Sequence, residues 1–407
     1  MLKFALVFLL CFTPRLAYLW WETPGEQPGI FYWELSQNVL SSGVLGFDGR
    51  PSTAFEPLYP LFLAAARWLT GDTLTWVLVL QIAVASLGAV YFYRLCLLLA
   101  DERTAWIAAL LFSFYPYLVR QSVSIIEITL LATLLVATAF HFCRMADARG
   151  AVAAGAAFGI TLLARMAALP VLVLGVAFLA FRGRRVQALG VALTAILVAL
   201  PMGLRNHHVD GSFLPTRGGE NLLAGNNRYA DQVIPDYNTD LLIDYVRILQ
   251  EQKAPQVANA GEPQMDAFYR DQAIEWMLQE PLRALRLKLL NVVYFFHPRI
   301  VPYHAIDEHT QLVFTNGDGI RVDGIPARNA AGEWLHGICY SVIFLTALAG
   351  VWLRRKETGR DAILYLMLLG FAAVGSVFFP ATRLRAPVEF VLMFFSACAL
   401  ARWTRRA

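Results

Sequence analysis

The chain has 407 residues, of which 57% are hydrophobic and 16% are charged, with a formal net charge of +4. Soluble domains are about 45–50% apolar and about 25% charged, so this composition indicates a membrane protein. The small net charge argues against nucleic acid as a partner. The five cysteines lie in apolar runs without CxxC or His-Cys spacing, so we expect neither a disulfide framework nor a zinc site.

Ten apolar runs follow one another along the chain, most of them near the roughly 20 residues that a membrane-spanning helix needs. The first follows Lys3 and has no small-residue cleavage site, so it is expected to be a retained span. The fold class predicted is an all-α polytopic membrane protein with about ten transmembrane helices and a small mixed segment outside. The runs cover residues 4–21, 74–99, 104–121, 125–143, 150–166, 168–182, 187–204, 335–353, 361–379 and 386–403.

The orientation follows from the basic residues of the short loops. If Lys3 is inside, every strongly basic short loop falls on the same side, and both chain ends are cytoplasmic. The chain then divides into an N-terminal transmembrane region, an extracytoplasmic segment and a C-terminal transmembrane region. These cover residues 1–204, with a catalytic first external loop at 22–73, then 205–333, and then 334–407.

The first external loop contains a short amphipathic helix pattern, YWELSQNVLSSG, followed by the turn GFDGRP. The next stretch, PLYPLFLAAARWLTG, is too short for a span, and counting it as one would place the later basic loops outside. We expect an interfacial or re-entrant helix there.

Two helices are expected in the extracytoplasmic segment, over residues 264–279 and 282–296. The second alternates basic and apolar residues. This pattern suits a helix lying flat on the bilayer with Arg283, Arg286 and Lys288 toward the lipid headgroups.

Ionisable residues within the spans all fall in the outer half of the predicted topology. Each costs about 2.5–3.5 kcal/mol at mid-membrane, so such groups usually face a protein interior or a water-filled cavity. An excess of arginine suits an anionic ligand such as a phosphate or diphosphate. For any single arginine, snorkelling to the headgroups explains the position equally well. The residues are Arg15, Arg120, Glu127, Arg165, Arg383, Arg385 and Glu389.

The order of these residues resembles the GT-C class of polytopic glycosyltransferases, in the branch of the protein O-mannosyltransferases and lipid A aminoarabinose transferases (family 39-like). The resemblance rests on six pieces that occur in the family's order. They are Arg15-Leu16, YWELSQNVLSSGVLGFDGRPSTAFEPLYP, YPYLVRQSVSIIEITLL, LLARMAALP, RNHHVDGSFLPTRGGENLLAGNN and RLRAPVEFVLMFF.

The resemblance implies a membrane glycosyltransferase that uses a polyprenyl-phosphate-linked sugar on the outer face and inverts at the anomeric carbon. An acidic residue of the first external loop would act as general base. The partners implied are membrane lipid, the lipid-linked donor, and an envelope lipid, glycan or protein as acceptor. No cofactor is certain, and a divalent metal is left open. A compact chain without an Asn-x-Ser/Thr sequon favours a bacterial inner membrane.

The expected general base is not placed uniquely. Where the family has an Asp, this chain has Pro28, and the nearby acids are Glu22, Glu26 and Glu34. Glu26 could serve as base with a one-turn change of loop path, Glu34 is the second candidate, and the third alternative is that neither serves and catalysis is altered or lost. Glu127 matches the family's second acidic position, where it would orient the acceptor, a metal or a neighbouring Arg. Glu56 stands where relatives often carry a basic residue.

Substrate-binding residues are expected from the same motifs and from the Gly-Asn-rich loop, where glycines permit close approach of the backbone. That loop could equally be a plain connector. The expected side chains are Arg15, Tyr32, Tyr59, Arg120, Arg165, Asn221, Asn226, Arg383 and Arg385. Two other functions compete with sugar transfer: a transporter or flippase of lipid-linked sugars, which usually shows two related halves, and a catalytically silent member of an envelope glycan assembly complex.

Overall fold

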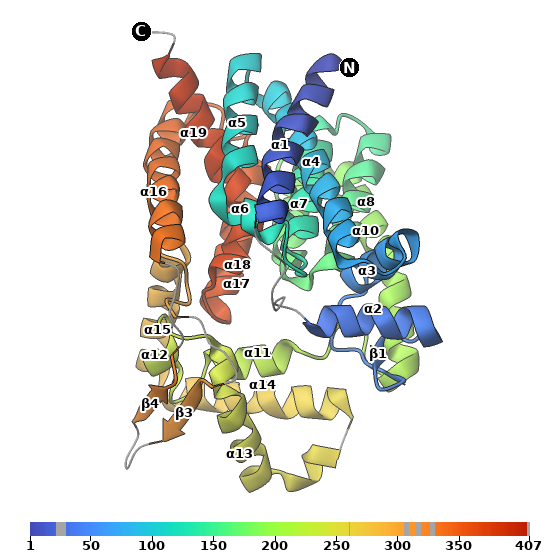
Figure 1. The fold of residues 1–407 in the computed structure, drawn as a ribbon, viewed down its shortest axis with the longest axis vertical. Coiled ribbons are helices and arrows are strands. Elements are labelled where there is room, and N and C mark those ends of the chain that lie inside the picture. Colours follow the sequence, from blue (N-terminus) through green and yellow to red (C-terminus); the bar gives the residue numbers. More distant parts are fainter. Residues whose placement is uncertain (22–29, 260, 305–308, 315–318, 326–329, 405–407) are drawn as a thin grey trace.

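The computed structural model describes residues 1–21, 30–259, 261–304, 309–314, 319–325 and 330–404. The described part is almost entirely helical, with two short antiparallel hairpins at one end (Figure 1). The all-α fold class predicted from the sequence is confirmed.

Each of the ten apolar runs forms a helix or a broken helix. Five of the described helical segments are long and apolar enough to cross a membrane: Leu2–Trp21, Leu74–Leu99, Arg185–Asp210, Ala330–Leu353 and Thr382–Trp403. The elements are α1 (Leu2–Trp21), α4 (Leu74–Leu99), α5 (Glu102–Phe114) with α6 (Pro116–Gln121), α7 (Ile128–Arg144), α8 (Ala148–Ala164), α9 (Leu169–Phe181), α10 (Arg185–Asp210), α16 (Ala330–Leu353), α17 (Ala362–Val377), and α18 (Thr382–Arg385) with α19 (Glu389–Trp403).

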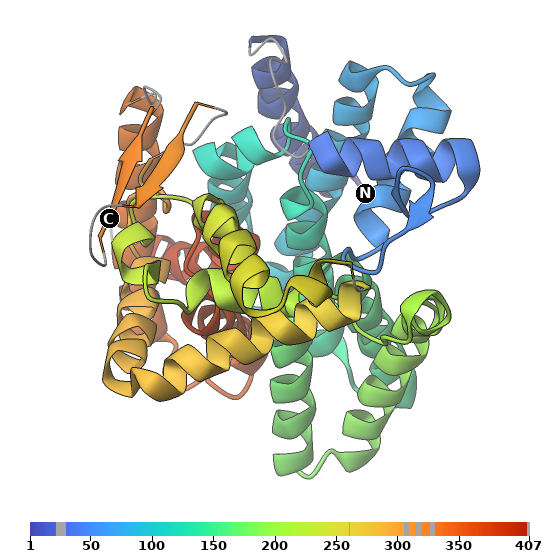
Figure 2. The same cartoon turned by 90° about the horizontal axis from the view of Figure 1, so that it is seen from below.

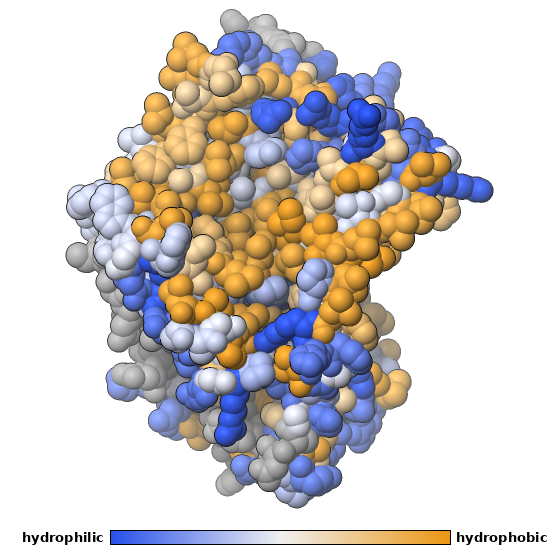
Figure 3. Space-filling view, turned by 90° about the vertical axis from the view of Figure 1, so that its right-hand side faces the viewer, coloured by the Kyte–Doolittle hydropathy of each residue, from blue (hydrophilic) through white to orange (hydrophobic). Residues whose placement is uncertain are grey.

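The start of α1 and the end of α19 lie at the same end of the helix bundle (Figure 1). Apolar side chains form a broad central band on the side where α8 and α10 lie, with polar side chains above and below it (Figure 3). Such a band on the outside of a helical bundle is the surface that faces lipid. Large apolar side chains of α10 and α16, such as Leu193, Leu197, Leu345 and Trp352, are exposed there or on the neighbouring faces.

The first external loop forms α2 (Ile30–Ser42), a hairpin of β1 (Gly46–Phe47) and β2 (Arg50–Pro51), and α3 (Leu58–Thr70). The hairpin turn is the predicted GFDGRP, where Asp48 and Gly49 have φ of 50° and 72°. At 13 residues, α3 is about 20 Å long and too short to span a bilayer. The expected short helices of this loop are therefore present.

The second external segment packs against the same end of the bundle. Its long helix α14 crosses that end, from α15 toward the first external loop, when the molecule is seen from below (Figure 2). The elements are α11 (Gly218–Gly225), α12 (Ala230–Val233), α13 (Ile243–Lys253), α14 (Glu262–Gln279), α15 (Pro281–Phe295), β3 (Gln311–Phe314) and β4 (Ile320–Asp323). The two helices expected in this segment are thus found at nearly the expected residues.

Two of the three basic residues of α15 that were expected at the headgroups, Arg283 and Lys288, contact protein, and Arg286 is exposed. Arg283 pairs with Asp231 at 2.6 Å, and Lys288 Nζ donates to the Val377 carbonyl at 2.7 Å. That carbonyl is the last of α17, where helix carbonyls lack partners within the helix. The apolar side chains Leu285 and Leu289 of α15 are exposed.

Thr53 joins the first external loop to the second segment. Its backbone N–H and Oγ1 both donate to Glu262 Oε2, at 2.7 Å and 2.9 Å. Thr216 Oγ1 donates to the same carboxylate oxygen at 3.0 Å, and Asp210 accepts from Thr53 Oγ1. Arg205 adds bonds to loop carbonyls nearby. The two external segments therefore form one joined structure.

Candidate functional site

A buried cluster of tyrosines and acid–base side chains lies where the first external loop meets the bundle. We call Tyr32, Glu56, Tyr59, Glu127 and Arg165 the carboxylate cluster. Glu127 Oε1 lies 3.1 Å from Arg165 Nη1, and Glu127 is only 7% exposed. The Tyr32 side chain lies within electrostatic reach of Glu127, Arg165 and Glu56. Five residues from four separate parts of the chain thus meet here.

The charged residues Glu127 and Arg165 of the cluster are positioned by the helices that they flank. Glu127 stands directly before α7 and Arg165 directly after α8. Glu56 Oε1 accepts a hydrogen bond of 2.8 Å from the backbone N–H of Met166. Glu56 therefore fixes the segment that carries Arg165.

Gln81 of α4 positions the segment that carries Glu127. Its amide nitrogen donates to the carbonyls of Ser122 and Ser124 at 3.1 Å and 2.8 Å. Its amide oxygen accepts from the Tyr59 hydroxyl at 2.8 Å. Because Gln81 is buried, these bonds form in a region of low dielectric, where they are strong.

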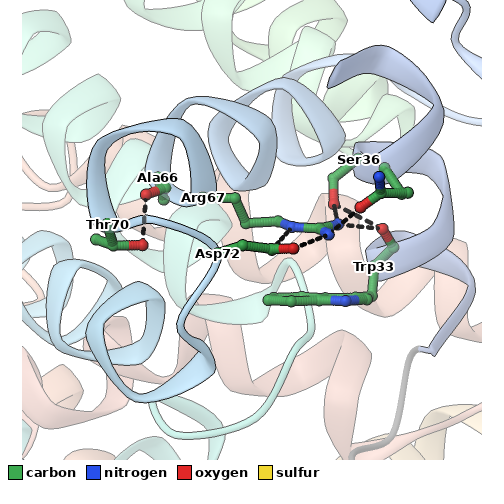
Figure 4. A network of polar contacts seen from close by, with 7 residues as sticks. Trp33, Ser36, Ala66, Arg67, Thr70 and Asp72 are labelled. Atoms are coloured by element: carbon green, nitrogen blue, oxygen red, sulfur yellow. Dashed lines mark hydrogen bonds and ion pairs between the residues drawn. The ribbon is translucent and has the colours of Figure 1, made fainter. Parts of the chain in front are cut away.

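Arg67 fixes α2, and hence Tyr32, on α3 (Figure 4). Its guanidinium lies over the Trp33 ring with 4.0 Å to the ring centroid. It donates to the Trp33 carbonyl at 2.8 Å, to Ser36 Oγ at 2.7 Å and to Asp72 at 2.5 Å. Arg67 is 2% exposed, so this set of bonds forms the buried contact between the two short helices.

Burial controls the acidity of the two tyrosines. Loss of solvent, followed by the negative charge of Glu127, raises the pKa of Tyr32 well above its ordinary value. The pKa of Tyr59 is raised well above its ordinary value by the same two causes. Both hydroxyls therefore stay protonated at neutral pH and can donate hydrogen bonds.

A cavity of about 200 Å³ lies beside the cluster, between α6, the start of α18 and the second external segment. We call it the anion pocket, because Arg120 and Arg383 both line it together with Gln121, Ser124 and Tyr237. Within the described residues, neither guanidinium has a hydrogen bond or ion pair. Ser124 of the pocket lining is connected to the carboxylate cluster through Gln81, which donates to the Ser124 carbonyl and accepts from the Tyr59 hydroxyl.

Two arginines expected to bind substrate, Arg15 and Arg385, make buried bonds within the protein. Arg15 donates to the carbonyls of Phe112 and Ser113 at 3.1 Å and 2.7 Å, near the end of α5. Arg385 pairs with Glu389 at 2.6 Å and donates to the carbonyls of Phe295 and His297. Both arginines are at most 1% exposed. Their observed contacts join helices.

The two acids and two asparagines expected in the site lie in different parts of the chain. Glu26 lies outside the described residues. Glu34 is an exposed residue of α2. Asn221 donates to the Arg217 carbonyl at 2.8 Å, and Asn226 joins α11 to α17 through the Val377 carbonyl at 2.9 Å. The charged residues thus separate into the carboxylate cluster, the anion pocket, and inter-helix contacts.

Some members of the site were not expected from the sequence. Glu56 was read as a departure from a family pattern, yet it contacts the segment of Arg165. Gln81 and Arg67 sit in helices that otherwise look apolar. The signal that could have found them is the cost of a lone polar side chain in an apolar run. In the described part of the chain, no three His, Cys, Asp or Glu side chains come together as a metal site does.

Comparison with known proteins supports the resemblance. Residues 50–204 match the family model described as dolichyl-phosphate-mannose-protein mannosyltransferase. The structure is similar to the oligosaccharyltransferase AglB of Archaeoglobus fulgidus in complex with an inhibitory peptide and a dolichol-phosphate, with a TM-score of 0.57 and 15% identity. That match covers 99% of this chain and 50% of the other. The GT-C fold expected from the sequence is confirmed.

Two further solved structures also match nearly the whole length of this chain. The same oligosaccharyltransferase solved with Zn and sulfate gives a TM-score of 0.55 at 14% identity, covering 99% of this chain and 49% of that one. ArnT of Cupriavidus metallidurans bound to undecaprenyl phosphate gives 0.44 at 15% identity, covering 98% and 77%. The chain thus spans about half the length of the oligosaccharyltransferase. None of the curated proteins matches the sequence.

Proposed function

From the resemblance of this chain to the GT-C glycosyltransferases, we propose that it moves a sugar from a polyprenyl-phosphate carrier to a hydroxyl of an envelope acceptor. The reaction takes place on the non-cytoplasmic face of a membrane, which we take to be a bacterial inner membrane. The observation that carries this proposal is that Gln81 connects the carboxylate cluster to the lining of the arginine-lined pocket, through its bonds to the Tyr59 hydroxyl and the Ser124 carbonyl.

The anion pocket binds the donor's phosphate in this proposal. Arg120 and Arg383 have no described partner, and a guanidinium fork matches phosphate oxygens. The pocket is lined by α6 and by the chain between α17 and α18, where apolar helices of the bundle end. A carrier lipid can therefore keep its chain in the membrane while its phosphate reaches the two arginines. The oligosaccharyltransferase and ArnT neighbours were each solved with such a lipid phosphate.

The transfer itself is a displacement with inversion at the anomeric carbon. The acceptor oxygen bonds to that carbon as a carboxylate takes its proton, and the carbon–oxygen bond to phosphate breaks. Polyprenyl phosphate leaves with the electron pair, and the two arginines stabilise its added charge. Glu26 remains the proposed base, while Glu127, held by Arg165, orients the acceptor hydroxyl.

No step of this mechanism uses a metal ion. Arg165 supplies a positive charge 3.1 Å from Glu127 and within electrostatic reach of Glu56. A neighbour was solved with Zn, so metal dependence is tested directly. We expect EDTA to leave the rate unchanged, and a rate that returns only on addition of Zn²⁺ or Mn²⁺ contradicts this.

The experiment measures release of free polyprenyl phosphate. Purified protein in nanodiscs is given a panel of radiolabelled polyprenyl-phosphate sugars and an envelope extract as acceptor. Removing a general base lowers the rate about 10²–10⁴-fold. We therefore expect Glu26→Gln to lose that much activity, and Glu127→Gln to lose activity because the acceptor hydroxyl is no longer oriented. Glu34→Gln, at the second candidate base in an exposed position on α2, should retain activity, and a loss there would move the base to Glu34.

Two results would change the assignment. Full activity in both Glu26→Gln and Glu127→Gln removes the proposed site, and loss in Glu56→Gln instead moves the base to Glu56. Movement of intact lipid-linked sugar across a proteoliposome, without release of polyprenyl phosphate, favours a flippase over a transferase.

A further inference from the structure

A second cavity, of about 290 Å³, lies within the second external segment. We call it the external cavity. It lies between α11, α13 and α14, and its polar lining includes Arg217, Glu220, Asn221, Thr239, Gln250 and Tyr269. The helices that surround it give it walls independent of the membrane bundle.

The lining offers both hydrogen-bond donors and acceptors. Gln250 Oε1 accepts from the Tyr269 hydroxyl at 2.5 Å. No bond of its amide nitrogen to another described residue is present, although Gln250 is only 6% exposed. Asn221 uses its amide nitrogen on the Arg217 carbonyl, which leaves its amide oxygen as an acceptor. Glu220 adds a carboxylate, 3.3 Å from Arg217 Nε.

This chemistry favours a ligand rich in hydroxyl groups. A hydroxyl both donates and accepts, so it can satisfy a lining of amides, carboxylates and one guanidinium together. A phosphate is disfavoured, because the carboxylates of Glu220 and Asp240 outnumber the single Arg217. Small-molecule pockets are usually about 300–1,000 Å³, so this cavity takes a small group such as one sugar ring.

The external cavity lies next to both parts of the candidate site. Arg217 stacks over the Phe55 ring with 5.2 Å to the centroid, and the Phe55 ring centroid is 6.2 Å from that of Tyr32. On another side, Thr239 lines both this cavity and the anion pocket. Phe55 therefore contacts both Arg217 of the cavity lining and Tyr32 of the carboxylate cluster.

We propose that the external cavity binds a sugar residue of the acceptor, next to the residue that receives the transferred sugar. The acceptor is then a glycan or a glycolipid. That the bound saccharide belongs to the acceptor rests on the proposed function. That the cavity binds a saccharide does not depend on the proposed function. In this proposal, the second external segment selects the class of acceptor by binding this sugar residue.

The test measures saccharide binding without any donor. Protein in nanodiscs is mixed with a panel of methyl glycosides (hexosides, N-acetylhexosaminides and pentosides) and followed by saturation-transfer difference NMR. We expect at least one glycoside to bind the wild type. Ala224→Phe fills the cavity and should abolish the signal. Loss of one hydrogen bond in Gln250→Ala should weaken binding about fivefold.

Gln279→Ala, on the exposed end of α14, is the matched control and should bind like the wild type. Asn221→Ala provides a milder variant if Ala224→Phe does not fold, and it should also weaken binding. Absence of any glycoside signal overturns the proposal. Binding equal to that of the wild type in both Ala224→Phe and Asn221→Ala also overturns it. Binding of an unglycosylated Ser/Thr peptide alone also overturns it.

Saccharide binding and sugar transfer fail in different ways. A wild type that binds glycosides but releases no polyprenyl phosphate from any donor keeps the saccharide site and removes the transferase. A wild type that releases polyprenyl phosphate without binding any glycoside keeps the transferase and removes the saccharide site.

Discussion

Glu127 and Arg165 form an ion pair of 3.1 Å at the junction of two helices, α7 and α8, with the first external loop. Glu127 is 7% exposed, and Tyr32 from α2 lies against both charges. Removing one partner of a buried ion pair is strongly destabilising, because the remaining charge is left uncompensated. The pair therefore ties the stability of the site to its charge balance.

Arg165→Met should lower the free energy of unfolding by about 3 kcal/mol, whereas Glu127→Gln/Arg165→Met together should cost less than the sum of the single changes. The reason is that the double variant leaves no unpaired charge. Thermal or denaturant unfolding in detergent measures the three values. Arg120→Met, at an exposed arginine without a described partner, is the control. Simple additivity of the two single changes would show that the charges are not coupled.

Arg67→Met should destabilise the protein by roughly 2–4 kcal/mol, since it removes the buried guanidinium's bonds to Ser36 Oγ and the Trp33 carbonyl and its stacking on the Trp33 ring. Because α2 carries Tyr32, sugar transfer should fall as well. Unfolding curves and the rate of polyprenyl phosphate release measure both effects. Arg50→Met, on the exposed hairpin strand β2, serves as the control. An unfolding midpoint equal to that of the control would contradict the structural role of Arg67.

Arg383→Gln should raise the donor KM by about 10- to 100-fold, because hydrogen bonds to a charged phosphate are each worth roughly 1.5–3 kcal/mol. Arg120→Gln should do the same. Initial rates at varied donor concentration measure the effect, and the acceptor KM should stay constant. Arg321→Gln, on the exposed strand β4, is the control. An unchanged donor KM in both pocket variants would move the phosphate elsewhere.

The free energy of unfolding should rise between about pH 8 and pH 10, because Lys288 titrates at a lower pH in the folded state than in the unfolded state. Burial lowers the pKa of Lys288 to about 8, whereas the unfolded chain titrates near 10.4. Between those values the unfolded state binds more protons than the folded state, so stability increases with pH and levels off above the unfolded pKa. The neutral amine still donates to the Val377 carbonyl. Unfolding midpoints across this pH range should rise in the wild type and less in Lys288→Met.

The order of helices was predictable because apolar runs and basic loops are local properties of the sequence. The short length of α3 and the alternation of loop charges were enough to keep it out of the count of spans. The turn at Asp48 and Gly49 followed from residue types that tolerate positive φ. These features depend on neighbours in the chain, and sequence patterns report neighbours well.

The partners of individual arginines were not predictable. Arg15, Arg165 and Arg385 look alike as single basic residues in apolar runs. Arg15 binds carbonyls near a helix end, Arg165 pairs with a carboxylate, and Arg385 does both. A free carbonyl at the end of a distant helix has no sequence signature, because every residue carries one. Only the packing of helices distinguishes the three roles.

The bonds of Thr53 have a consequence for exchanging parts between related proteins. One small set of hydrogen bonds joins four parts of the chain: Thr53 of the loop, Asp210 at the end of α10, Thr216 before α11 and Glu262, the first residue of α14. If only one of the two segments is exchanged in a chimera, the carboxylate at the Glu262 position and the hydroxyl at the Thr53 position no longer come from matched sequences, and these hydrogen bonds are lost. Specificity in such chimeras should therefore transfer only when both segments are exchanged together.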